Sequence, residues 1–185
     1  MVYPPQGDDN ADEVAPVGEG FTHIDEEGSP AMVDVGNKPD TLREARARGL
    51  VRMSPETLKL IREGKNPKGA VFQVAKIAAI MACKHTWSLI PLCHPIQITG
   101  VEVDFKADWE RGEVEVEVGV NSFGKTGVEM EALTGVAVAA LTVYDMCKAL
   151  DKTIVVDNIR LIKKSGGKSG EFIREGEEPW EERRP

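Results

Sequence analysis

The stretch ITGVEVDFKADWERGEVEVEVGV, residues 98–120, decides the fold. Its two halves, 98–107 and 113–120, alternate apolar and polar residues, which is the period of a strand with one buried face. The connection between them, 108–112, has the length and the glycine of a hairpin loop. The stretch therefore predicts an antiparallel pair of strands.

A third strand is predicted upstream, over residues 43–53, where small or apolar side chains alternate with charged ones. Ser54 and Pro55 then open a short helix that ends near Gly64, and a longer helix is predicted over 71–90. The apolar face of the strand holds Ala45, Ala47, Val51 and Met53, and the other face holds Glu44, Arg46, Arg48 and Arg52.

Two more elements are predicted downstream of the hairpin. Residues 128–150 are helix formers with small residues on one side, and residues 153–162 are rich in β-branched side chains. The main elements in order are strand, helix, strand, strand, helix, strand. This order predicts an α+β, ferredoxin-like (βαββαβ) domain with helices packed on one face of an antiparallel sheet.

Charge divides the chain into a body and two ends. The net charge is −8, but residues 1–20 hold five acids and no base, and residues 171–185 hold six acids and three bases. We expect a disordered acidic tail over 1–20, a single domain over 21–170 and an acidic C-terminal tail over 171–185. The body is electrically balanced, which argues against a nucleic-acid binder, since such proteins usually show a clustered basic surface.

The expected compartment is the cytoplasm. The sequence has no run of about 18 apolar residues, and acids stand where a signal peptide would have bases, so we expect no membrane partner. Cys83, Cys93 and Cys147 are an odd number of cysteines, which suits a reducing compartment better than a disulfide framework.

Two motifs have the composition of phosphate-binding loops. Residues 119–126, GVNSFGKT, satisfy the expression GxxxxGK[ST]. That loop normally works at the edge of a mainly parallel sheet with a later magnesium-binding Asp, so the preceding hairpin disfavours a nucleoside triphosphatase. Residues 163–170, KKSGGKSG, either wrap an anion with N–H groups and ammonium charges or form a solvated loop.

Cysteine and histidine do not have the spacing of a metal site. Structural zinc needs paired ligands at short, regular intervals, which Cys83, His85, Cys93 and His94 do not provide, so we expect no metal. His94 lies in a loop bounded by prolines. It is either a ligand-binding or proton-transfer group or a polar surface residue.

The helix predicted over 128–150 carries three ionisable residues on one stripe. At 100° per residue, Lys148 lies about 60° from Asp145, and Glu131 lies about 40° from it. The commoner interpretation is an ion pair on a solvated face. The apolar neighbours of the pair allow another, a partly desolvated acid and base tuned for catalysis. These neighbours are Val143, Tyr144, Met146 and Ala149.

Five longer segments resemble the cyclic pyranopterin monophosphate synthase family, accessory enzymes of the second stage of molybdenum cofactor biosynthesis. The resemblance covers about residues 21–172, and these segments are far more specific than the phosphate-loop expression. They are MVDVGNK (32–38), LREARARG (42–49), HTWSLIPLCHP (85–95), GKTGVEMEALTGVAVAALTVYDMCKAL (124–150) and KSGGKSGEF (164–172).

The resemblance implies a lyase that converts 3',8-cyclo-7,8-dihydroguanosine 5'-triphosphate to cyclic pyranopterin monophosphate and releases diphosphate. The partner is therefore a GTP-derived small molecule. The step needs proton transfers, opening of the purine-derived ring, pyranopterin closure and attack on the α-phosphorus, but no redox or metal centre. We expect no cofactor, apart from Mg²⁺ that could accompany the triphosphate.

The resemblance also implies the site residues. The roles are our own hypotheses: Lys68 and Lys148 would act as general acid and base once burial and neighbouring cations lower a pKa, and Asp145 would orient or ionise Lys148. Glu129 and Glu131 would hold the guanine-derived edge. The catalytic positions are Asp145, Lys148 and Lys68; the substrate-binding positions are Leu92, Cys93, His94, Met130 and Glu131, with Glu129 nearby; the candidates for the triphosphate are Arg43, Lys125, Lys164 and Lys168.

Members of this family are homohexamers, trimers of dimers, with active sites at subunit interfaces. Such an assembly would explain how scattered residues meet and how an apolar helix surface is covered. The main rival is a ferredoxin-like module that binds a metabolite without chemistry. The cluster of Lys68, Asp145 and Lys148 argues against that rival, because binding alone does not need it.

Overall fold

The computed structural model describes residues 29–181. The chain divides into two compact units, Met1–Val33 and Asp34–Pro185, and the sheet and helices described below belong to the second. The acidic tail predicted over 1–20 lies outside the described residues, as does the predicted start of the domain at residue 21.

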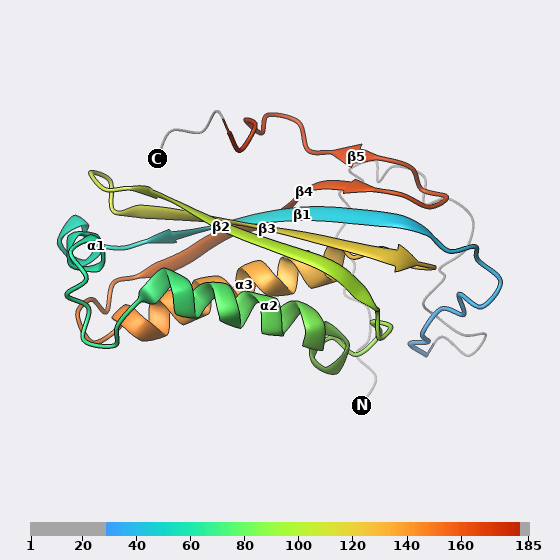
Figure 1. Ribbon diagram of the computed structural model, residues 1–185, viewed down its shortest axis with the longest axis horizontal. Helices are drawn as coiled ribbons and strands as arrows, with labels where there is room; N and C mark the ends of the chain where they lie inside the picture. Colours follow the sequence, from blue (N-terminus) through green and yellow to red (C-terminus); the bar gives the residue numbers. More distant parts are fainter. Residues whose placement is uncertain (1–28, 182–185) are drawn as a thin grey trace, which may run out of the picture. The chain divides into compact units, whose positions relative to one another are not determined.

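Five antiparallel strands form one sheet in the order β2-β3-β1-β4-β5 (Figure 1). β2 and β3 are the predicted hairpin, and β1 lies between β3 and β4. The first four strands have the ferredoxin-like order, so the predicted α+β fold class is confirmed. The strands span Thr41–Arg52 (β1), Ile98–Asp108 (β2), Glu113–Gly124 (β3), Val155–Ser165 (β4) and Phe172–Ile173 (β5).

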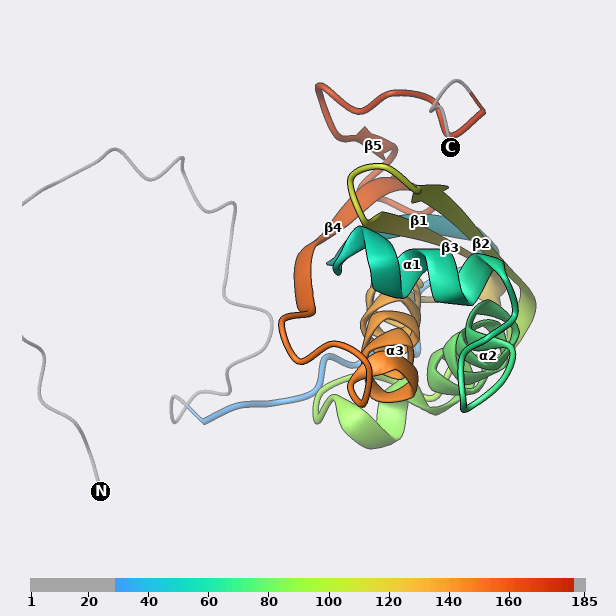
Figure 2. The ribbon, with the colours of Figure 1, turned by 90° about the vertical axis from the view of Figure 1, so that its left-hand side faces the viewer.

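Two long helices, α2 (Val71–Leu89) and α3 (Glu129–Cys147), lie side by side on one face of this sheet (Figures 1 and 2). The core between them is made of strand valines and small helix residues, as the alternation of the strands predicts. Gly135 of α3 has a packing role, because a Cβ there would lie 2.6 Å from Cys83 Sγ on α2. The short α1 (Pro55–Arg62) begins after Ser54, whose hydroxyl accepts a hydrogen bond from the amide of Thr57.

Helix α3 is apolar because it is a core helix. Its length and composition alone would allow it to cross a membrane, but 56% of that stretch is buried inside the domain. Contacts with α2, β1, β3 and β4 account for this burial.

Several element ends differ from the prediction. β3 runs to Gly124 and β4 to Ser165, beyond the predicted ends at 120 and 162, because both pair with the first residues of β1. α3 ends at Cys147 instead of 150. The amide of Asp151 donates to Cys147 O, and the Asp151 carboxylate accepts hydrogen bonds from the amides of Ser54 and Thr153. These bonds turn the chain toward β4 before the predicted end of the helix.

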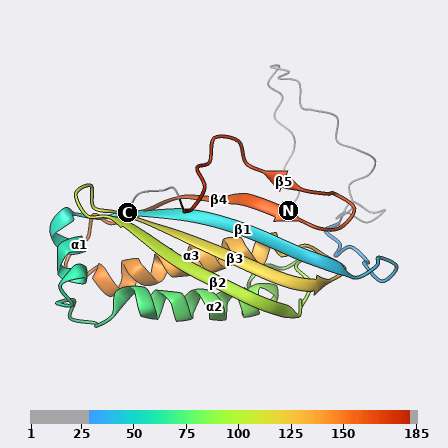
Figure 3. The ribbon, with the colours of Figure 1, turned by 45° about the horizontal axis from the view of Figure 1, so that its top comes forward.

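The predicted C-terminal tail is packed on the sheet as far as it is described. Residues 171–181, here called the C-terminal segment, begin with the edge strand β5 and continue over the face opposite the helices (Figures 2 and 3). Glu177 forms ion pairs with Arg48 and Arg160. The Trp180 ring lies 5.3 Å from Arg48 Cζ and 4.9 Å from Lys106 Nζ. The acidic composition that predicted a tail also suits a segment that binds a row of basic side chains.

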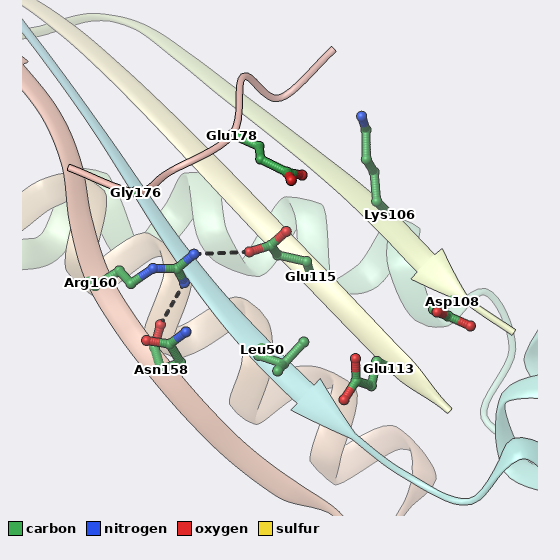
Figure 4. A pocket seen from close by; sticks show the side chains of 9 residues that line it. All are labelled: Leu50, Lys106, Asp108, Glu113, Glu115, Asn158, Arg160, Gly176 and Glu178. Atoms are coloured by element: carbon green, nitrogen blue, oxygen red, sulfur yellow. Dashed lines mark hydrogen bonds and ion pairs between the residues drawn. The ribbon is translucent and has the colours of Figure 1, made fainter. Parts of the chain in front are cut away.

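A cavity of about 400 Å³ lies beside the C-terminal segment (Figure 4). Arg160 spans it, donating to the carbonyl of Asn158 and pairing with Glu115 at 3.2 Å. Its lining mixes both signs of charge and includes none of the predicted site residues. The cavity therefore belongs to the anchoring of the C-terminal segment and not to the candidate site.

Candidate active site

Three predicted residues meet at the C-terminal end of α3. Lys68, in the loop between α1 and α2, and Lys148, the residue after α3, both contact the carboxylate of Asp145. Lys68 Nζ lies 2.8 Å from Oδ2, and Lys148 Nζ lies 2.8 Å from Oδ1. Each carboxylate oxygen therefore has its own ammonium group. These three residues are called the lysine–aspartate cluster below.

The charges of this cluster stabilise one another. The hydrogen bond from Lys148, followed by that from Lys68, lowers the pKa of Asp145 to about 2. The hydrogen bond to Asp145 raises the pKa of Lys148. We expected burial and neighbouring cations to lower a lysine pKa, and for Lys148 in the single chain that expectation was wrong. The side chains of Asp145 and Lys148 are 56% and 54% exposed, so attraction to the carboxylate outweighs desolvation.

Glu131 lies at the other end of α3 and is separate from this cluster. It precedes Asp145 by fourteen residues, which is about 21 Å along a helix. Its side chain is only 3% exposed, and within the described part of the chain its Oε2 has no hydrogen-bond partner. Burial raises the pKa of Glu131 to about 7, with a further contribution from Glu129. Near neutral pH this carboxyl group therefore populates both the acid and the carboxylate form.

The loop after α2 belongs to the same end of α3. Burial raises the pKa of the Cys93 thiol, and the charge of Glu131 raises it further, which places the two groups near each other. His94 lines a cavity of about 330 Å³ together with Lys125. Lys125 Nζ donates a hydrogen bond to the carbonyl of Gly36. Leu92 is half-buried in this loop, and Met130 is 38% exposed beside Glu131.

Arg43, Glu129 and Lys164 complete this group. Lys164 Nζ lies 3.1 Å from Glu129 Oε1. Arg43 donates from Nε to Gly124 O over 3.2 Å and from an Nη to the carbonyl of Lys125 over 3.0 Å, so it fixes the segment after β3. Its guanidinium also rests on Gly167, where a Cβ would lie 1.6 Å from an Nη. The loop 163–170 is thus held against Arg43 at its glycines, whereas Lys168 is exposed.

The predicted residues therefore form two groups at opposite ends of α3 (Figure 1). One is the lysine–aspartate cluster. The other, called the glutamate group, contains Arg43, Cys93, His94, Glu129, Glu131 and Lys164. The stripe predicted from helix periodicity does not bring Glu131 to Asp145, because periodicity says nothing of axial separation and Glu131 is buried at the other end of the helix.

Comparison with protein families matches residues 32–167 to the MoaC family. The chain belongs to this family. The cyclic pyranopterin monophosphate synthase of Pelotomaculum thermopropionicum is 60% identical over 163 residues, which cover 88% of this chain and 96% of the relative. The proteins of the same name from Heliobacterium modesticaldum and Roseiflexus sp. are 58% and 57% identical over 155 residues, or 84% of this chain and 98% of each relative.

The family match contains both groups and ends before the C-terminal segment. Among residues 29–181, no group of three or more His, Cys, Asp or Glu is placed to hold a metal ion. The expectation that no metal is required stays a prediction. Residues 124–126, the GKT of the phosphate-loop expression, begin at the end of β3, which is antiparallel to both of its neighbours. Phosphate-binding loops of triphosphatases normally follow a strand of a parallel sheet, so the fold does not support the triphosphatase alternative.

Proposed function

We propose that this chain is a cyclic pyranopterin monophosphate synthase. It would convert 3',8-cyclo-7,8-dihydroguanosine 5'-triphosphate to cyclic pyranopterin monophosphate and release diphosphate. The observation that carries the proposal is the Asp145 carboxylate held between two ammonium groups. It occurs in a chain that is 60% identical, over 88% of its length, to a protein of that name.

In this proposal the lysine–aspartate cluster transfers protons. Asp145 keeps Lys68 and Lys148 charged in the free chain, and the incoming substrate competes for their hydrogen bonds. One lysine then acts as general acid and the other, once it has given up its proton, as general base. The hydroxyl that attacks the α-phosphorus loses its proton to the base. The bond from phosphorus to the bridging oxygen breaks, and diphosphate leaves with that electron pair.

The glutamate group would bind the substrate. Glu129 and Glu131 hold the N–H donors of the guanine-derived ring. Glu131 gains a hydrogen bond in this way, because its buried Oε2 has no other partner within the described residues. Leu92, Cys93, His94 and Met130 would line the rest of the ring's surroundings. Arg43, Lys125, Lys164 and Lys168 would bind the triphosphate, with Mg²⁺ as its counter-ion where one is present and no other cofactor.

Two half-sites about 21 Å apart on one helix favour a site shared between copies of the chain. We infer that the protein is a homohexamer, a trimer of dimers, in which the lysine–aspartate cluster of one copy faces the glutamate group of another. Large apolar side chains on the helix surfaces support this inference, since monomers rarely expose such patches. They include Val74, Ile77 and Met81 on α2 and Leu141 on α3, which are 43%, 64%, 49% and 58% exposed.

We further propose that the protein works in the cytoplasm. The three cysteines support this, since Cys83, Cys93 and Cys147 are all free thiols. The GTP-derived substrate also belongs to the compartment that holds GTP.

The proposal is tested by incubating the full chain with the cyclised GTP derivative. We expect stoichiometric diphosphate and a product that oxidises to a fluorescent pterin. A metabolite-binding module would bind the substrate and release neither. A triphosphatase would instead release phosphate or diphosphate from GTP or ATP, and Lys125→Ala would abolish that activity.

A further inference from the structure

Asn66 is a buried polar residue that the proposed chemistry does not use. It is 5% exposed in the loop between α1 and α2. Its Nδ2 donates to the carbonyl of Met146 over 3.2 Å and contacts Cys147 Sγ at 3.4 Å. Its Oδ1 accepts a hydrogen bond from the backbone amide of Lys68 over 2.8 Å. One side chain therefore joins the last turn of α3 to the backbone of Lys68.

These contacts use groups that a helix end leaves free. The last four carbonyls of an α-helix have no partner within it, and Met146 O is one of them. By binding that carbonyl, Asn66 sets the position of its loop on α3. The anchor lies one residue from Asp145, which Lys68 Nζ contacts at both Oδ2 and the backbone carbonyl, each over 2.8 Å. The anchor and the target of the lysine thus lie on the same helix turn.

We propose that Asn66 is a positioning residue that acts through Lys68: it fixes the Lys68 backbone on the end of α3 and so keeps the ammonium on Asp145. A free lysine side chain loses rotamer entropy when it is held in such a contact, and a fixed backbone reduces the number of conformations it must search. These contacts require both the donor and the acceptor of the Asn66 side-chain amide. Asp would set a carboxylate against the Met146 carbonyl, and Ala would leave that carbonyl and the Lys68 amide without this partner.

The catalytic part of this inference rests on the proposed function, whereas the contact between Lys68 and Asp145 can be measured without turnover. Among residues 29–181, the charged groups that contact the Asp145 carboxylate are Lys68, from the loop between α1 and α2, and Lys148, the residue after α3. The titration of Asp145 therefore reports whether Lys68 is in place. It can be followed by carboxyl carbon NMR in the full ligand-free chain.

The experiment compares Asn66→Ala, Lys68→Ala and the double variant. Lys68→Ala should raise the pKa of Asp145 from about 2, because one of its two partners is lost. Asn66→Ala should shift it in the same direction, and the double variant should add nothing to Lys68→Ala. Additive shifts, or a wild-type titration in Asn66→Ala, would overturn the proposal. If Asn66→Ala does not fold, Asn66→Ser is used with the same criteria, since Ser retains an acceptor but is too short to reach Met146 O.

A kinetic measurement tests the catalytic part. Since Asn66 does not touch substrate in this account, Asn66→Ala should lower kcat by about 10- to 100-fold and leave KM unchanged. A change confined to KM would contradict a positioning role. The matched control is Thr142→Ala, which removes a side-chain hydrogen bond to the carbonyl of Val138 in the middle of α3 and should change neither kcat nor the Asp145 titration. If the chain lacks synthase activity, no variant shows turnover in this assay. The NMR comparison still tests whether Asn66 keeps Lys68 in contact with Asp145.

Discussion

Lys68 and Asp145 are 77 residues apart in the sequence, yet the Lys68 ammonium lies 2.8 Å from both the carboxylate and the backbone carbonyl of Asp145. Lys148 contacts the other carboxylate oxygen at the same distance. Three charged groups on an exposed surface usually gain little from such contacts. Their arrangement is therefore better explained by chemistry than by stability.

Replacement of either lysine should remove product formation and leave the fold intact. We expect Lys68→Ala and Lys148→Ala each to lower kcat by about 10²- to 10⁴-fold, the usual contribution of a proton-transfer group. Single-turnover assays and gel filtration measure the two properties. Lys59→Ala, which removes an exposed lysine of α1, is the control. Loss of assembly in parallel with activity would make the lysines structural.

Glu131 should make stability depend on pH. Its folded pKa of about 7 lies above the ordinary 4.5, so the folded chain binds the extra proton between these values. Its contribution to stability is complete below about pH 4.5 and is lost as pH rises through about 7. Between about pH 5 and 8, wild type should lose on the order of 1–3 kcal/mol relative to Glu131→Gln in urea unfolding. Parallel plots of the free energy of unfolding against pH for wild type and Glu131→Gln would contradict this. Glu56→Gln, which replaces an exposed acid, should follow wild type.

The C-terminal segment should stabilise the sheet without contributing to catalysis. Glu177→Gln removes a charge that contacts Arg48, which is 3% exposed, and Arg160, which is 11% exposed. Because loss of one partner leaves buried arginines less well compensated, we expect the free energy of unfolding to fall by about 1–3 kcal/mol. Substrate turnover should stay at the wild-type level. Glu175→Gln, on an exposed residue of the same segment, should change neither property.

Local sequence patterns predict the strands and helices of this fold. They do not predict contacts between residues that are far apart in the sequence or along a helix axis. The alternation in 98–120 and the small, alternating side chains of 43–53 specify strands directly, because side-chain period is a local property. Helix periodicity placed Asp145, Lys148 and Glu131 on one stripe, but the axial rise separates Glu131 from the other two. Asn66 and Glu177 were missed because their partners are 80 and 129 residues away, at Met146 and Arg48. Composition showed only a polar loop and an acidic tail.

The separation of the site into two groups along α3 leads to the most direct test of the account. Lys68→Ala and Lys164→Ala each damage one group, and both variants should be inactive alone. Mixed and allowed to exchange subunits, they should recover about a quarter of wild-type turnover of the GTP-derived triphosphate, because half of the dimers are then mixed and each mixed dimer keeps one intact site. Mass spectrometry of the mixture verifies the exchange. Exchange without any recovery of cyclic pyranopterin monophosphate formation would contradict a shared active site.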